Sequence, residues 1–199
     1  MKLLVVSASQ RSPSQSARVG DYLVGLTSPF GQHHHLELCR HPLPFWDGDS
    51  EQSKGNAWAA LSPLLVAADA LVLITPEWGG MATPLLKNFL LMCEPEHTAH
   101  KPVLLVSVVN GVSGGYPIGE LRMNALKNNK LVPVPDHLII RNVEQVLNPA
   151  IGGPRDRRLR ERIDYSLHML AGYTRALKTM REGLRSRPYP DRHRYAYGM

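Results

Sequence analysis

Hydrophobic positions along the chain gather into short runs separated by polar loops. The runs at 2–7, 70–75 and 102–109 contain almost no polar residue inside them, a pattern typical of strands covered on both faces. Two less regular runs complete a set of five. The predicted strands are Lys2–Ser7, His34–Leu38, Ala70–Thr75, Pro102–Val109 and Leu131–Val134, with a possible return strand at Leu138–Ile140.

Between these runs the apolar residues recur at helical spacing. The predicted helices are Ala17–Leu26, Trp58–Ala68, Pro84–Met92, Ile118–Asn128 and Arg155–Arg185. Strands alternate with helices at the size of a βαβ unit, which predicts a parallel sheet with helices on both faces. We expect one α/β domain over residues 1–185 and a basic Pro/Tyr tail over 186–199, whose low apolar content cannot form a core.

The composition, 43% hydrophobic and 20% charged over 199 residues, fits one globular domain. No apolar run approaches the ~20 residues of a membrane helix, and the run at 3–6 is too short for the core of a signal peptide. Cys39 and Cys93 match neither a CxxC pair nor a zinc pattern. We therefore expect a cytoplasmic protein with two free thiols.

The net charge of +6 is concentrated at one end of the chain. Residues 155–199 hold twelve Lys and Arg against five Asp and Glu, a net charge of +7, whereas residues 1–154 are close to neutral. We interpret this segment as a solvated helix packed on the domain. Nucleic-acid binding through it is the alternative, which a salt titration with a duplex would test.

Ligands of an open parallel sheet bind beyond the carboxyl ends of its strands, so the loops that follow the strands are the informative ones. The loop 8–16 is rich in serine, contains Arg11 and leads into a helix. Hydroxyls and a guanidinium beside a helix N-terminus favour a phosphate group. The alternative interpretation of this loop is a serine N-cap at the surface.

Two further loops follow core strands. In the loop 75–84, Gly79 and Gly80 allow the backbone to approach a planar ligand, and Trp78 is placed to cover such a ring. The alternative here is a turn with a buried tryptophan. The loop 110–116 contains three glycines in five positions and completes one rim of the sheet.

Other nucleotide-binding motifs are absent from the sequence. Neither GxGxxG after the first strand nor GxxxxGK[ST] occurs. An ordinary Rossmann site for NAD and a P-loop for ATP are both disfavoured. A phosphate loop beside two glycine-rich loops favours FMN.

These loops resemble the NADPH-dependent FMN reductase family of flavodoxin-like proteins, which includes quinone, azo-dye and chromate reductases. The resemblance covers residues 2 to about 140. It is most specific over 75–89, TPEWGGMATPLLKNF, which is similar to the family's TPEYN–small–PxxLKNxxDW segment. The loop 8–16 is similar to the family's GSxRxxSxN phosphate loop. The chain departs from the family at Ala8, Ser16, Trp78, Gly79 and in the Leu90-Leu91 pair.

The resemblance implies a three-layer flavodoxin-like fold with a five-stranded parallel sheet, non-covalently bound FMN and NAD(P)H as co-substrate. It implies an enzyme that passes electrons to a small-molecule acceptor, such as a quinone or free flavin, by a ping-pong cycle, in a homodimer or homotetramer. A non-enzymatic electron carrier or redox sensor is the alternative. The expected cofactor-binding residues are Ser9, Arg11, Ser14, Gln15, Ser16, Pro76, Glu77, Trp78, Gly79, Gly80, Asn110, Gly111, Ser113 and Gly114.

No side chain is expected to act as a chemical catalyst, because cofactors carry hydride transfer, so a Ser-His-Asp constellation is not expected either. Neighbouring histidines on a strand point to opposite faces, so we do not expect a metal at His33-His34-His35. We interpret Glu77 as mainly structural in its turn, Cys93 as a half-buried thiol, and Lys87 as facing a neighbour or solvent.

Overall fold

A computed structural model describes residues 1–26, 29–48, 54–148, 150 and 152–195. Residues 49–53 and, within the predicted tail, residues 196–199 lie outside the described residues. The strands are β1 (Lys2–Ser7), β2 (Gln32–Glu37), β3 (Ala70–Pro76), β4 (Pro102–Val108) and β5 (Val132–Ile140). The α-helices are α1 (Gln15–Val24), α2 (Gly55–Ala67), α3 (Pro84–Met92), α4 (Pro95–Thr98), α5 (Tyr116–Glu120) and α6 (Pro154–Ser186). A π-helical turn, Leu121–Ala125, continues α5, and short 3₁₀ turns lie at Leu38–Arg40, Val143–Gln145 and Arg192–Tyr195.

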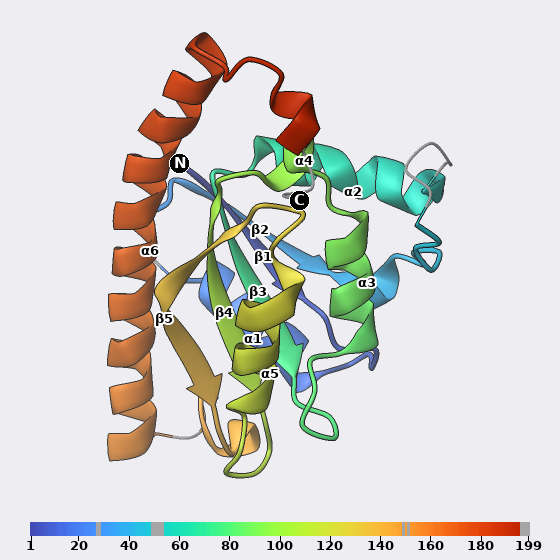
Figure 1. Ribbon diagram of the computed structural model, residues 1–199. Helices are drawn as coiled ribbons and strands as arrows, with labels where there is room; N and C mark the ends of the chain where they lie inside the picture. The colour runs from blue at the N-terminus through green and yellow to red at the C-terminus, as the bar shows by residue number, and fades with distance from the viewer. Residues whose placement is uncertain (27–28, 49–53, 149, 151, 196–199) are drawn as a thin grey trace.

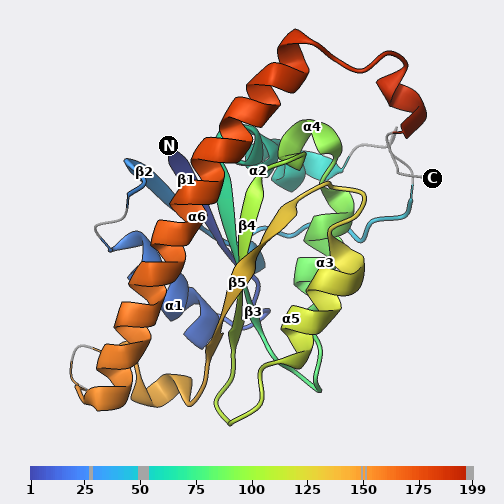
Figure 2. The same cartoon turned by 60° about the vertical axis from the view of Figure 1, so that its left-hand side comes forward.

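The five strands form one parallel sheet in the order β2-β1-β3-β4-β5. This is the flavodoxin-like order, so the predicted fold class is confirmed. Helices α1 and α6 cover one face, and α2, α3 and α5 cover the other, which Figure 2 shows with the sheet nearly edge-on.

Alternation along the strands divides the core into two layers. In β1, Leu4 and Val6 pack toward α2 and α3, whereas Leu3 and Val5 pack toward α1 and α6. Side chains alternate across a strand, so a strand covered on both faces needs an unbroken apolar run. The sequence of β1 shows this run, and all of it but Lys2 is buried.

Helix α6 runs the length of the sheet on one face (Figure 1). Its apolar residues Ile163, Leu167 and Leu170 are buried in the layer formed with β4 and β5. The protein's own sheet covers these positions, which agrees with the interpretation of this segment as a helix packed on the domain.

The prediction of a possible return strand at Leu138–Ile140 was wrong. Residues 132–140 form one parallel strand with an irregularity, since Val103 pairs with Pro133 but Leu105 pairs with His137. Pro133 and Pro135 have no backbone N–H to donate to a ladder, which explains the interruption. The Arg122 guanidinium donates to the carbonyl oxygens of residues 134–136 and so supplies hydrogen-bond donors to this irregular segment.

No helix among the described residues is long and apolar enough to cross a bilayer. Cys39 and Cys93 are both free thiols, as predicted.

Candidate functional site

The three predicted loops meet at one edge of the sheet. The register pairs Ser7 of β1 with Ile74 of β3, and Pro76 of β3 with Val108 of β4. These strands therefore end side by side, and the loops that follow them share the carboxyl edge where open α/β sheets bind ligands.

The first loop ends in a well-formed helix N-terminus. Ser14 is the N-cap of α1, and its Oγ accepts from the backbone N–H of Ala17 at 3.0 Å. A helix leaves its first N–H groups without intrahelical acceptors, so those of Gln15 and Ser16 remain available for an anion. Ser9 is buried, and its Oγ accepts from the N–H of Arg11 at 3.1 Å, which fixes the turn of the loop.

The hydroxyl of Ser16 gives the clearest support for a ligand-binding role of this loop. It lies in the first turn of α1, is 1% exposed, and has no hydrogen-bond partner among the described residues. Burying a hydroxyl without a partner is costly. The neighbouring Gln15 is partly engaged, because its Oε1 accepts from Arg18 Nε at 2.7 Å.

The second loop is a two-residue hairpin. Trp78 and Met81 exchange backbone hydrogen bonds at 3.2 and 3.0 Å around Gly79 and Gly80, whose φ angles are +57° and +74°. Both central residues of a type I′ turn need positive φ, which glycine adopts without strain. The guanidinium of Arg11 lies 5.2 Å from the centre of the Trp78 ring, so the first two loops are in contact.

The third loop is joined to the second through Glu77. Its Oε2 accepts from the backbone N–H of Gly114 at 2.8 Å and from the hydroxyl of Ser113. This supports the interpretation of Glu77 as structural in its turn. Its other oxygen, Oε1, is buried without a partner among the described residues.

The backbone of the third loop approaches the sheet closely at Gly114. A Cβ added there would lie 2.4 Å from Ile139 Cγ2, and the φ of +99° is itself unfavourable for other residues. Asn110 and Gly111 are exposed, and the Gly111 carbonyl accepts from the Asn142 N–H at 3.2 Å.

Two residues that sequence reasoning missed hold these loops in place. Thr83 donates its hydroxyl to the Ala8 carbonyl at 2.7 Å and accepts from Leu86 N–H as the N-cap of α3. Arg141 Nε donates to the carbonyls of Val112 and Ser113 at 2.6 and 2.7 Å. The Thr-Pro pair before α3 was a readable capping signal, but its link to Ala8 spans 75 residues and leaves no local pattern.

A Ser-His-Asp constellation, which we had not expected, lies beneath the first loop. Ser7 Oγ is 2.9 Å from His35 Nε2, and His35 Nδ1 is 2.8 Å from Asp21 Oδ1. Ser7 is the last residue of β1, and its buried hydroxyl is already engaged by the His35 ring. The chain of bonds therefore ties β1, β2 and α1 together rather than forming a nucleophile.

Lys87 and Cys93, to which the sequence analysis gave no chemical role, lie in environments that agree with that interpretation. Lys87 forms an ion pair with Glu120 at 2.9 Å, which agrees with its facing a neighbour. Cys93 is buried rather than half-buried, and burial strongly raises the pKa of its thiol, which opposes thiolate chemistry.

The residues present fit FMN at this edge of the sheet. The α1 N-terminus, Arg11 and the partnerless Ser16 hydroxyl match the donors that a phosphate ester needs. Trp78 and the Gly79-Gly80 hairpin offer an aromatic face and close backbone for a planar ring. Which of the fourteen predicted residues contact the cofactor stays a prediction.

Comparison with known proteins agrees with this geometry. Residues 1–145 match the model of the family described as NADPH-dependent FMN reductase. An NADPH azoreductase of Bacillus sp. (strain OY1-2) is 32% identical over 115 residues, which are 58% of this chain and 62% of that protein. The match thus spans less than two thirds of the length of that curated relative.

Solved structures share the fold. A flavoenzyme NAD(P)H:(acceptor) oxidoreductase of Paracoccus denitrificans is similar with a TM-score of 0.71 and 17% identity, covering 88% of this chain and 97% of its own. An oxidoreductase of Corynebacterium diphtheriae is similar with a TM-score of 0.66 and 19% identity, covering 87% of this chain and 96% of its own.

Proposed function

Because the chain belongs to the NADPH-dependent FMN reductase family, we propose that it binds FMN and passes electrons from NAD(P)H to a small-molecule acceptor, such as a quinone or free flavin, in a ping-pong cycle. Family membership makes it an NAD(P)H-dependent oxidoreductase. The cofactor, the acceptor and the order of steps in this chain are the proposed part.

The observation that carries the proposal is the donor set of the first loop. Within the part of the chain that the structure describes, no anionic side chain bonds the first N–H groups of α1, the Arg11 guanidinium or the buried Ser16 hydroxyl. A phosphate monoester supplies acceptors to each of these donors and carries the charge that a helix N-terminus favours. FMN has this group, whereas riboflavin lacks it.

The chain's own residues bind and orient in this proposal. Bound FMN supplies the ring that accepts a hydride and later gives up electrons. Trp78 and the backbone of Gly79 and Gly80 position that ring, and Glu77 fixes the third loop against the second through Ser113 and Gly114. No side chain is assigned a proton transfer.

Absorption spectroscopy and steady-state kinetics test the proposal. The purified protein, alone or mixed with FMN, should show a bound-flavin spectrum and oxidise NADPH or NADH only when a quinone or flavin acceptor is present. Double-reciprocal plots at several acceptor concentrations should be parallel, as a ping-pong cycle requires. Bound FMN without turnover for any pair of nicotinamide and acceptor would instead identify an electron carrier or sensor.

A further inference from the structure

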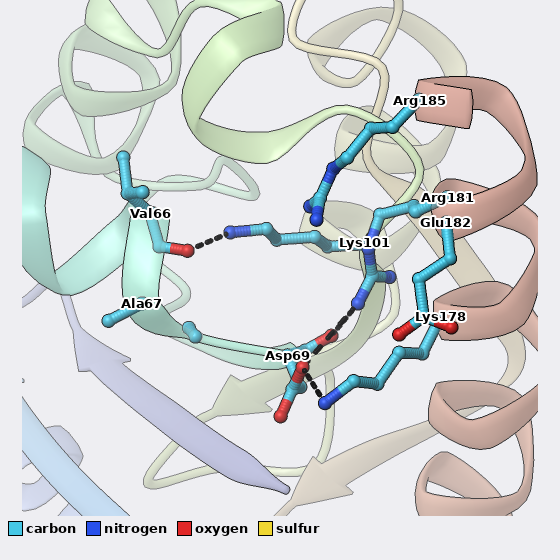
Figure 3. A pocket seen from close by; sticks show the side chains of 9 residues that line it. Val66, Ala67, Asp69, Lys101, Lys178, Arg181, Glu182 and Arg185 are labelled. Carbon is cyan, nitrogen blue, oxygen red and sulfur yellow. Dashed lines mark hydrogen bonds and ion pairs between the residues drawn. The ribbon is translucent and has the colours of Figure 1, made fainter. Parts of the chain in front are cut away.

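A pocket lies at the edge of the sheet opposite to the candidate flavin site. It has a volume of about 200 Å3 and opens between the end of α2, the start of β4 and the last turns of α6 (Figure 3). Strands of six or seven residues separate it from the flavin edge, a distance of roughly 20 Å at ~3.3 Å per residue. The charged residues of its wall are Asp69, Lys101, Lys178, Arg181, Glu182 and Arg185.

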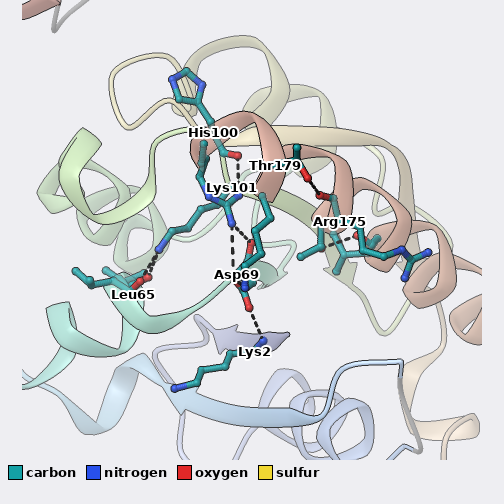
Figure 4. Close-up of polar contacts among 12 residues, drawn as sticks. Lys2, Leu65, Asp69, His100, Lys101, Arg175 and Thr179 are labelled. Carbon is teal, nitrogen blue, oxygen red and sulfur yellow. Dashed lines mark hydrogen bonds and ion pairs between the residues drawn. The ribbon is translucent and has the colours of Figure 1, made fainter. Parts of the chain in front are cut away.

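Asp69, one of the two acidic residues of this pocket, is already paired with cations. The Asp69 carboxylate is 3.2 Å from Lys178 Nζ and 3.7 Å from the Arg181 guanidinium (Figure 3). It also accepts from the Lys2 backbone N–H at 2.9 Å (Figure 4). Burial alone would raise the pKa of Asp69, but the hydrogen bonds from Lys2 and Lys178 lower it, so the carboxyl is ionised at neutral pH. Four cations and two carboxylates then leave the wall with a net positive charge.

Two of the cations are buried and held rigidly. Lys101 is 5% exposed, and its Nζ donates to the carbonyls of Leu65 and Val66 at 2.5 and 3.0 Å. Arg181 is 7% exposed and donates to the His100 carbonyl at 3.0 Å. A guanidinium has five N–H donors and an ammonium three, so both groups keep donors beyond these bonds.

The cationic side chains of the pocket lie close enough together to lower one another's pKa. Burial, with a further contribution from Arg181, lowers the pKa of Lys101 to about 8. Burial also lowers the pKa of Arg181, and Arg185 adds to that effect. Positive charges brought this close are stabilised by an anion between them.

Arg185 supplies a cation without a partner. Its side chain extends from α6 toward the pocket in Figure 3, and within the described part of the chain it forms no hydrogen bond or ion pair. Glu182, one turn earlier, also lines the wall without such a partner among the described residues. The two exposed side chains therefore affect the potential of the pocket without holding the fold together.

We propose that this pocket binds a small phosphate-type anion, with Lys101 and Arg181 as fixed donors and Arg185 as the side chain that closes on the ligand. Guanidinium groups match the geometry of phosphate oxygens. The volume is below the roughly 300–1,000 Å3 of pockets for drug-sized ligands, so it suits a phosphate or diphosphate group rather than a dinucleotide. This ligand would be separate from the flavin and nicotinamide of the proposed function.

Calorimetric titration with inorganic pyrophosphate, at constant ionic strength, tests the proposal in the full-length protein. Arg185→Ala should weaken binding about tenfold, the lower end for losing a hydrogen bond to a charged group. Glu182→Gln should tighten binding, because it removes a repelling charge. Arg158→Ala, which deletes an exposed arginine of α6 outside the pocket, should leave the affinity unchanged.

Arg11→Ala separates this pocket from the flavin loop, which also attracts phosphate. Pyrophosphate affinity that survives Arg11→Ala but falls with Arg185→Ala supports the pocket. The absence of measurable binding at millimolar pyrophosphate would overturn the proposal. So would an affinity that responds to Arg11→Ala and not to Arg185→Ala, or equal losses in Arg185→Ala and Arg158→Ala.

Discussion

At the scale of single residues, the candidate site is held by contacts between loops that lie far apart in sequence. Arg11 lies over Trp78, and Glu77 bonds Ser113 and Gly114. Each contact joins two of the three loops, so the donors intended for a ligand are positioned before it arrives. Such preorganisation lowers the entropy cost of binding.

Arg11 offers the most direct test at this scale. Arg11→Ala should weaken FMN affinity by ~1.5–3 kcal/mol, the usual worth of a hydrogen bond to a charged group. The fold should persist, because Arg11 is exposed. Flavin-fluorescence titration measures the change, with Arg158→Ala as the control for net charge. An unchanged dissociation constant in Arg11→Ala would remove this residue from the site.

Gly20 of α1 lies so close to the His35 ring that no side chain fits at position 20. A Cβ at Gly20 would lie 2.3 Å from His35 Nε2, the atom that bonds Ser7. Gly20→Ala should therefore lower the free energy of unfolding by ~1–3 kcal/mol, as overpacking does. Gly172→Ala, also inside a helix but with open space at its Cβ, should raise it by up to ~1 kcal/mol. Urea denaturation measures both, and equal effects would contradict the packing of His35 on α1.

The sequence could indicate the donors of the site but not their partners. Serines, a glycine pair and an arginine after predicted strands are readable locally. The Ser7–His35–Asp21 chain and the Thr83–Ala8 bond are not, because each joins residues 14 to 75 positions apart. The same limit applies to Arg141, whose bonds to the third loop depend on where β5 ends.

At the scale of elements, the sheet order and the placement of α6 decide the architecture. Strands β1, β3 and β4 were predictable from their apolar runs. The sequence of β2, QHHHLE, has no such run, so only the βαβ spacing, from which the parallel sheet also follows, favoured a strand there. The full extent of β5 was not predictable, because Pro133 and Pro135 lie inside the strand and prolines argue against a continuous strand. The apolar stripe of α6 was correctly located, but a sequence cannot tell whether the sheet of the same chain or a partner covers it.

The end of α6 is fastened to the domain through Asp69. Asp69→Asn should lower the free energy of unfolding at pH 7 by about 1.5–3 kcal/mol, since it weakens bonds to Lys178 and Arg181. The folded-state pKa of Asp69 is below the ordinary value of 3.8. Its contribution is therefore complete above about pH 5 and declines as the pH falls below 3.8.

Urea midpoints from pH 7 to pH 3 measure this contribution. The difference in urea midpoint between the parent protein and Asp69→Asn should be constant near neutral pH and become smaller toward pH 3. Asp164→Asn, at an exposed position of α6, should have the same urea midpoint as the parent protein at every pH. A midpoint difference for Asp69→Asn that increases as the pH falls would contradict the claim that cations stabilise the ionised Asp69 carboxylate.

At the scale of the whole molecule, the resemblance to the reductase family implies a homodimer or homotetramer. The buried stripe of α6 gives no support for this, but exposed apolar side chains elsewhere remain. Val112 and Tyr116, beside the candidate site, are 81% and 73% exposed. Light scattering at micromolar concentration should give a mass of at least twice 22.2 kDa. A mass of one chain would contradict the prediction and would leave each site formed by a single subunit.

The discrimination between FMN and riboflavin tests the central claim most directly. The two flavins share the ring and the ribityl chain and differ only in the phosphate, for which the first loop and the α1 N-terminus supply donors. Fluorescence titration of the same protein with both should show FMN binding at least ten times more tightly, as one or more charge-assisted hydrogen bonds require. Equal affinities, or no binding of FMN, would contradict the account.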